Sequence, residues 1–136
     1  MLDGELTDAP FSNGQVASLE KALYRARSST GFEFSCYVGA LANGRQTAAT
    51  LHQQFRDPAR SVLVAVDPGG RLIEIVTGVG VKDYLDDQAC RLACLTMSSR
   101  FTIGDIAAGL RDGIIVLAEH ARTSESQEVL HSDLPE

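Results

Sequence analysis

The sequence predicts an α/β domain: a three-layer α/β/α sandwich with a small mixed sheet of at least three strands, one hairpin and about four helices. Three observations lead to this prediction. Residues 62–66 are continuously apolar, which is typical of a strand covered on both faces. The turn at residues 67–70, Asp-Pro-Gly-Gly, leads into a second strand-like segment at 71–77, which predicts a hairpin. Four further segments repeat apolar residues with helical spacing.

The chain begins with a predicted helix and strand. Ser12 or Asn13 is a suitable N-cap for a helix over residues 15–28, because both side chains accept hydrogen bonds from free backbone N–H groups. Gly31 is placed to end this helix in the left-handed conformation. Apolar residues then alternate with polar ones over residues 32–38, which predicts a strand with one buried face.

A short helix at residues 46–55 connects this strand to the apolar strand at 62–66. A strand–helix–strand unit favours a parallel, right-handed crossover, whereas the following hairpin pairs its strands antiparallel. The sheet is therefore predicted to be mixed.

The second half of the chain predicts two helices, each opened by an aspartate. Asp86 or Asp87 caps a helix that runs to about residue 98, and Asp105 caps a last helix over residues 106–121. The buried stripe of the first of these helices is predicted to consist of Leu85, Ala89, Leu92, Ala93 and Thr96.

Two glycine pairs lie in this half. Gly109 and Gly113 cost the last helix about 1 kcal/mol each relative to alanine, so we expect close packing of another element to offset that cost. Gly78 and Gly80 follow a strand and precede a helix, which is also the place of a dinucleotide-binding turn. Asp83 stands where that fingerprint needs a third glycine, which favours a plain turn.

Length and charge predict one domain, residues 11–122, between an acidic N-terminal tail at 1–10 and an acidic C-terminal tail at 123–136. The tails carry seven of the 18 Asp and Glu residues and no Lys or Arg, which leaves eleven acids against 12 bases in the domain. The net charge of −6 therefore belongs to the tails, which we expect to be disordered. A nearly neutral domain lacks the clustered basic face of a nucleic-acid-binding protein.

The same features bear on location. No apolar run is long enough to span a bilayer, and the first residues have neither the basic region nor the apolar core of a signal peptide. Three cysteines, an odd number, suit a reducing compartment. We therefore expect a cytoplasmic, soluble protein without membrane insertion.

Five aspartates near the predicted helix starts form the main candidate site. If the two helix starts meet at one end of the sheet, their carboxylates converge on a hard cation such as Ca²⁺ or Mg²⁺. The alternative is helix capping, which favours aspartate at the same positions without any metal. The candidate ligands are Asp83, Asp86, Asp87, Asp105 and Asp112.

The cysteines and histidines form a weaker candidate. Cys90 and Cys94 lie one helical turn apart and offer two zinc ligands, but further ligands from Cys36, His52 or His120 have no signature spacing. The alternative is that the cysteines are small buried apolar residues and that both histidines are exposed.

At this point the chain resembles the TPM domain, a family shared by thylakoid lumen proteins and their relatives. The resemblance rests on the order and spacing of short motifs across residues 15–121. These motifs are residues 73–80 (IEIVTGVG), Leu85-Asp86-Asp87, residues 101–105 (FTIGD) and Gly109-Leu110, with residues 29–33 (STGFE) and 62–66 upstream.

The resemblance implies an α/β/α sandwich with a mixed sheet. In that family, plant members have been assigned acid phosphatase activity, and some members are associated with calcium at acidic residues. The matching positions here are Asp86, Asp87 and Asp105, whereas Asp83 and Asp112 are added from their spacing. Because most members are exported or tethered, this chain is closer to the small soluble bacterial relatives of unknown function.

Three functions remain in view. The first is a non-catalytic interaction or regulatory module with a protein partner, for which Tyr84, beside the acidic turn, is the candidate contact. The alternative is a metal-assisted, acid phosphatase-like hydrolase, in which the bound cation offsets phosphate charge and activates water. The third is a thiol-redox or zinc protein that uses Cys90 and Cys94.

Overall fold

The computed structural model describes residues 11–133, with side chains described for residues 11–122. Its sheet has the order β1-β2-β3, with β1 parallel to β2 and β2 antiparallel to β3. The predicted fold class is confirmed. The elements are α2 (Asn13–Thr30), β1 (Glu33–Val38), α3 (Arg45–Gln53), a short 3₁₀ helix (Pro58–Arg60), β2 (Ser61–Asp67), β3 (Leu72–Thr77), α4 (Asp87–Phe101) and α5 (Ile106–Asp133).

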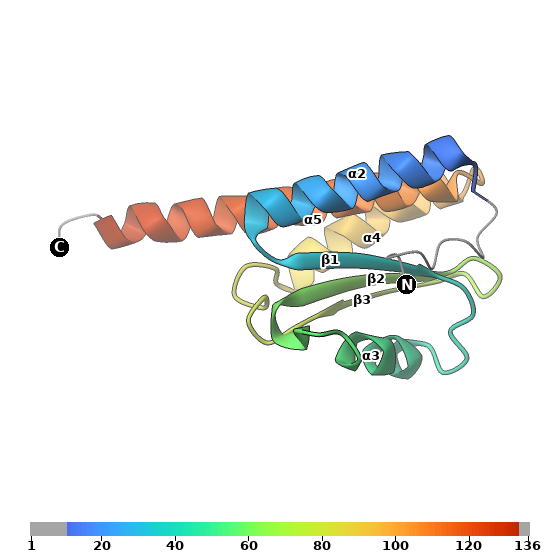
Figure 1. Ribbon diagram of the computed structural model, residues 1–136, viewed down its shortest axis with the longest axis horizontal. Coiled ribbons are helices and arrows are strands. Elements are labelled where there is room, and N and C mark those ends of the chain that lie inside the picture. Colours follow the sequence, from blue (N-terminus) through green and yellow to red (C-terminus); the bar gives the residue numbers. More distant parts are fainter. Residues whose placement is uncertain (1–10, 134–136) are drawn as a thin grey trace.

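The sheet lies between two helical layers, with α2, α4 and α5 on one face and α3 on the other (Figure 1). The central strand β2 is apolar throughout because both of its faces are covered. Val62, Val64 and Val66 belong to the core under the three helices, whereas Leu63 and Ala65 belong to the smaller core under α3. The alternation of side chains along one strand thus supplies both cores.

Local sequence accounts for the bounds of α2. Ser12 and Gln15 form a capping box, in which each side chain accepts a hydrogen bond from the other residue's backbone N–H, at 3.1 and 2.8 Å. At the other end Gly31 has φ of 80° and donates its N–H to Arg27. Both predicted caps are present.

The two glycines of α5 let α4 pack closely. A Cβ at Gly113 would lie 2.6 Å from Cγ of Met97, and one at Gly109 would overlap the ring of Phe101. The close packing expected from the helical glycines is therefore found, and its partner is the C-terminal half of α4.

The Gly78–Gly80 turn is also a packing device. Gly78 donates its N–H to Ser61 at 3.0 Å, and Gly80 donates to Ala59 at 2.8 Å. A Cβ at Gly78 would overlap the backbone carbonyls of Pro58 and Ala59. Glycine is required here because two backbone segments touch at this turn.

Three predictions about elements and burial are wrong. The last helix continues to Asp133 rather than ending near residue 121, because no glycine or proline interrupts the sequence before Pro135. Leu92, predicted as buried, is 45% exposed on the outer side of α4. His52, predicted as exposed, is buried and donates Nε2–H to the carbonyl oxygen of Ser61 at 2.9 Å.

Of the tails predicted at 1–10 and 123–136, residues 1–10 and 134–136 lie outside the described residues, whereas residues 123–133 continue the helix α5. Within the described part of the chain, no helix is both long and apolar enough to cross a bilayer.

Candidate functional site

Asp86 and Asp105 are used as helix caps and lie far apart. The Asp86 carboxylate accepts the N–H of Ala89 at 2.9 Å at the start of α4. The Asp105 carboxylate accepts the N–H of Ala108 at 3.2 Å at the start of α5. Because α4, with 15 residues and thus a length of about 22 Å, separates them, the two carboxylates do not converge.

The surroundings of the two caps confirm this separation. Asp105 lines a surface hollow with Ser12 at the start of α2, whereas Asp86 lines another hollow with His120, near the other end of the three-helix layer. The two acid-led turns thus open at different ends of the molecule.

The other three aspartates are also dispersed. Asp112 is held between Arg100 and Arg111, each with its Nε 3.2 Å from a carboxylate oxygen. Asp83 and Asp87 are exposed at the turn before α4 and at its first residue. Among the described residues, no group of three or more His, Cys, Asp or Glu side chains is arranged to hold a metal ion.

The cysteines are thiols in largely apolar surroundings. Burial raises the pKa of Cys36 to about 12. Burial is also the main cause of the raised pKa of Cys90 and of Cys94, and nearby carboxylates raise both further. Because the thiolate is the nucleophile and the metal ligand, this arrangement gives no support to thiol or zinc chemistry.

Tyr84 is half-buried and packs on the core. Its ring centroid lies 5.4 Å from that of Phe32, at an interplanar angle of 56°. The guanidinium of Arg60 covers Phe32 at 4.8 Å. Tyr84 is thus part of a small aromatic cluster, and its predicted role in partner binding stays a prediction.

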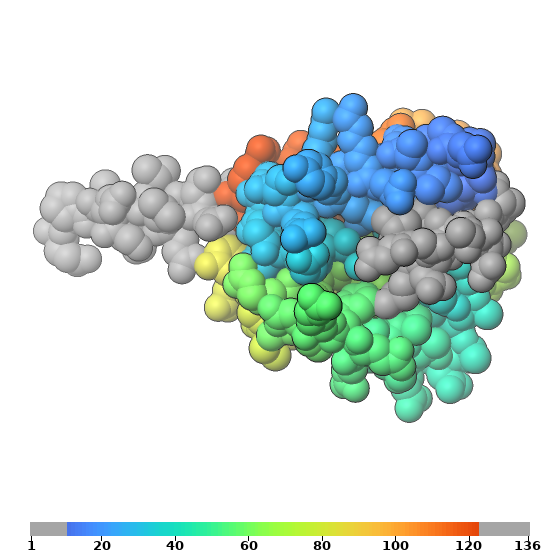
Figure 2. All heavy atoms as spheres, viewed as in Figure 1, coloured from blue at the N-terminus to red at the C-terminus, as the bar shows by residue number. Residues whose placement is uncertain are grey.

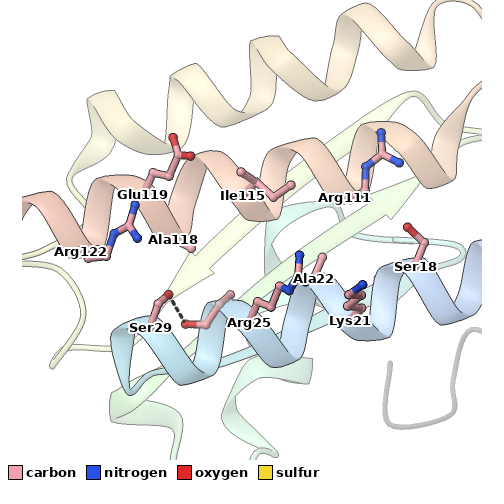
Figure 3. Close-up of a pocket in the computed structure, with 11 residues that line it drawn as sticks. Ser18, Lys21, Ala22, Arg25, Ser29, Arg111, Ile115, Ala118, Glu119 and Arg122 are labelled. Atoms are coloured by element: carbon pink, nitrogen blue, oxygen red, sulfur yellow. Dashed lines mark hydrogen bonds between the residues drawn. The ribbon is translucent and has the colours of Figure 1, made fainter.

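A groove between α2 and α5 has a different character. The two helices run side by side in the same direction, and the hollow between them has a volume of about 450 Å³ (Figures 1 and 3). Figure 2 shows that α2 forms the upper front of the molecule, on the opposite side from α3. The lining residues are Ser18, Lys21, Ala22, Arg25, Ala26, Ser29, Arg111, Ile115, Ala118, Glu119 and Arg122.

The groove combines an apolar floor with cationic walls. Its floor includes the buried residues Ala22, Ala26 and Ala118. Lys21 and Arg25 stand one turn apart on the α2 side (Figure 3). The α5 side adds two arginines and an isoleucine that is 42% exposed, and the groove contains a single acidic residue, Glu119.

Three of these cations have no counter-ion among the residues whose side chains the structure describes. Arg111 is paired with Asp112, but no carboxylate of the described residues lies within ion-pair distance of Lys21, Arg25 or Arg122. The groove therefore offers unpaired positive charge beside apolar surface, a combination that suits an amphipathic acidic segment.

Sequence reasoning missed this groove for an identifiable reason. Lys21 and Arg25 are exposed on α2, off its buried face. The α5 arginines lie at least 86 residues away in sequence (111 − 25 = 86), and only the packing of α5 beside α2 brings the two pairs together.

The sequence profile of one family, described as Domain of unknown function (DUF5130), matches residues 2–118. The chain belongs to this family. The resemblance to the TPM domain is therefore wrong. Its motifs describe features of local structure, since Gly78 marks a backbone contact, Gly104 has φ of 83° and Asp105 is a cap. Such turns and caps are common signals in α/β chains and do not identify a family.

Two relatives by sequence come from Mycobacterium tuberculosis. Uncharacterized protein Rv2468c and uncharacterized protein MT2543, from two strains, are each 33% identical over 119 residues. The match covers 85% of this chain and 70% of each relative.

Two solved structures are similar in fold. The BA42 protein of Bizionia argentinensis aligns with a TM-score of 0.74 at 17% identity, covering 86% of this chain and 85% of that one. The N-terminal domain of a protein from P. gingivalis aligns with a TM-score of 0.66 at 22% identity, covering 85% and 79%. At these identities the similarity shows the fold alone.

Proposed function

We propose that this protein is a non-catalytic interaction module whose α2/α5 groove binds an acidic polypeptide segment. The observation that carries the proposal is the set of cations at the groove, of which Lys21, Arg25 and Arg122 have no counter-ion among the described residues. An acidic ligand gains charge pairs there without breaking any ion pair within the described fold.

The shape of the groove favours a polypeptide as the ligand. The lining residues from Ser18 to Ser29 span eleven helical steps, about 16 Å at 1.5 Å per residue, and the floor is apolar. A helix or extended segment matches this length and can place apolar side chains on the alanine floor while its carboxylates meet the flanking cations.

The arrangement of the aspartates gives little support to the alternative, a metal-assisted hydrolase. Their carboxylates are separated and partly used as caps, and the groove cations lie on a different part of the surface. Calcium or magnesium binding at these aspartates stays a prediction, which calorimetric titration of the full chain tests directly.

The test of the interaction module is binding of a labelled amphipathic helical peptide with glutamates one turn apart and no Lys or Arg, measured by fluorescence anisotropy. Lys21→Glu and Arg25→Glu should each weaken binding roughly three- to ten-fold, because each reverses one exposed charge. Added salt should weaken binding of the unaltered chain as well.

Two controls make this test specific. Arg56→Glu reverses an exposed charge between α3 and the 3₁₀ helix, away from the groove, and should leave the affinity unchanged. A peptide with glutamine in place of glutamate should bind far less. Equal binding of the two peptides, or equal loss in the Arg56 variant, would show that the groove is not the binding site.

A further inference from the structure

A second hollow lies at the end of the molecule where the β2–β3 hairpin meets the turn between α4 and α5 (Figure 1). This hairpin hollow is lined by residues from 66–73 and from 98–106 and has a volume of about 380 Å³. That volume is in the size range of small-molecule sites. Because the hollow shares no lining residue with the α2/α5 groove, it is a separate site that the proposed function leaves unused.

The floor of the hairpin hollow is apolar. Val66 is buried there in the core under the three helices. Ile73, Phe101 and Ile106 are half-buried against the same core and line the hollow as well. A ligand with an apolar chain or ring therefore removes both its own apolar surface and that of the floor from water when it binds.

Arg71 supplies the charge that this hollow offers to a ligand. It is exposed, and no carboxylate of the described residues lies within ion-pair distance of it. The acidic residue of the lining, Asp67, already accepts the N–H groups of Leu41 and Gly70. Because Val66 faces the three helices, the next residue of β2, Asp67, points its carboxylate to the α3 side of the sheet.

The backbone at Arg71 is unusual for an arginine. Its φ is 55°, and in the described part of the chain it is the one residue other than glycine with a positive φ. This left-handed conformation favours glycine, yet Gly69 and Gly70, directly before it, do not adopt it. Such strain gathers at ligand-binding sites, where the side chain that it positions is needed. The turn thus carries an arginine where its own geometry favours glycine.

We propose that the hairpin hollow binds a small organic acid. Its carboxylate pairs with the guanidinium of Arg71, whose planar fork matches the two carboxylate oxygens. Its apolar chain or ring lies on the floor between the sheet and the end of α4. The ligand is a free small molecule, since the volume of the hollow suits one apolar group with its charged head and the longer groove suits a polypeptide.

The experiment is a titration of the full, isotope-labelled chain with phenylbutyrate, followed by the backbone amide signals in NMR spectra. The signals of residues 72–73 and 101–106 should shift, and those of the α2/α5 groove should not. Phenylbutyramide has the same ring and chain without the charge. It should shift the same signals but bind roughly three- to five-fold more weakly, because it forms no ion pair with Arg71.

Two substitutions at Arg71 isolate its role. Arg71→Gln should abolish the preference for the acid over the amide, so that both probes bind as the amide does. Arg71→Gly should abolish it too, and should unfold at the same or a higher urea concentration, because glycine adopts a φ of 55° without strain. Arg56→Gln, at an exposed arginine between α3 and the 3₁₀ helix, is the matched control and should keep the preference.

A third substitution tests the hollow itself. Ser98 is exposed on the part of its wall that α4 forms, and Ser98→Trp places an indole there. The added ring should fill the hollow and abolish binding of both probes, while circular dichroism shows that the helices are retained. Unchanged binding in this variant would place the probes elsewhere and overturn the site.

Other results would also overturn the proposal. These are an absence of amide shifts at millimolar phenylbutyrate, shifts confined to the α2/α5 groove, and equal affinity of the unaltered chain for the acid and the amide. A loss of preference in the Arg56 variant as large as that in the Arg71 variants would have the same meaning. The peptide assay uses other residues, so the proposed function of the groove stands or fails separately.

Discussion

The acidic residues around α4 and the cations of the groove between α2 and α5 differ in whether their charged side chains have partners within the fold. At the turns, Asp86 and Asp105 accept backbone N–H groups, and Asp112 is held by two arginines. At the groove, Lys21 and Arg25 have no carboxylate of the described chain within ion-pair distance. A polar group that the fold already satisfies gains less from a ligand than one that meets only water.

A further carboxylate, that of Asp67, also accepts backbone hydrogen bonds within the fold. It accepts the N–H of Leu41 and of Gly70, each at 3.0 Å, so that it connects the loop after β1 to the β2–β3 hairpin. The hydrogen bond from Leu41, followed by that from Gly70, lowers the pKa of the Asp67 carboxyl. Aspartates in this protein therefore mark turns and helix starts, and their clustering in sequence says little about ligands.

The largest expected effect on stability follows from a substitution in the Gly78 turn, which lies just before the acidic residues. Gly78→Ala should lower the free energy of unfolding by about 3 kcal/mol, because the added Cβ overlaps the backbone carbonyls of Pro58 and Ala59 and neither can move without breaking the turn. Urea denaturation followed by circular dichroism measures this loss.

Gly14 provides the matched control. It lies in the first turn of α2, where a Cβ would meet only Oγ of Ser12, at an ordinary contact distance of 3.9 Å. Gly14→Ala should therefore stabilise the protein by a few tenths of a kcal/mol to about 1 kcal/mol. If Gly78→Ala is as well tolerated as Gly14→Ala, the turn is free to serve a ligand and the packing explanation fails.

The next effect concerns the α4 cap. Asp86→Ala should lower the free energy of unfolding by about 1 kcal/mol, because the N–H of Ala89 loses its acceptor. The loss should be the same with and without millimolar CaCl₂ in the denaturation buffer. If calcium stabilises the unaltered chain and not the variant, Asp86 is a metal ligand as well as a cap, and the metal hypothesis is favoured again.

The fold followed from the sequence because its signals are local. Ser12, Gly31, Asp86 and Asp105 are caps, and the run at 62–66 is a strand covered on both faces, so each element is readable from neighbouring residues. His52 and Leu92 were misassigned because helical spacing alone does not fix which side of a helix faces the sheet, and tertiary packing decided both positions.

The groove could not be predicted in the same way. Its cations come from two helices that are far apart in sequence, and the charge count of the whole domain, near zero, concealed a local excess of positive charge. The pairing of α2 with α5, and with it the groove, is a property of the tertiary arrangement.

The smallest expected effect lies at the groove itself, where removing one charge should hardly change the free energy of unfolding. Lys21 and Arg25 are like charges one turn apart on α2, a spacing that destabilises a helix by a few tenths of a kcal/mol. Lys21→Ala should therefore leave the free energy of unfolding unchanged or raise it by up to about 0.5 kcal/mol. Arg27→Ala, on the same helix, removes an ion pair with Glu33 at 3.3 Å and should lower the free energy of unfolding slightly.

A loss of stability above about 1 kcal/mol in the Lys21 variant would show that Lys21 contributes to the stability of the fold. A neutral or stabilising result means that the positive charge is kept at the groove at a small cost to the helix, as expected of a side chain whose partner lies on another molecule.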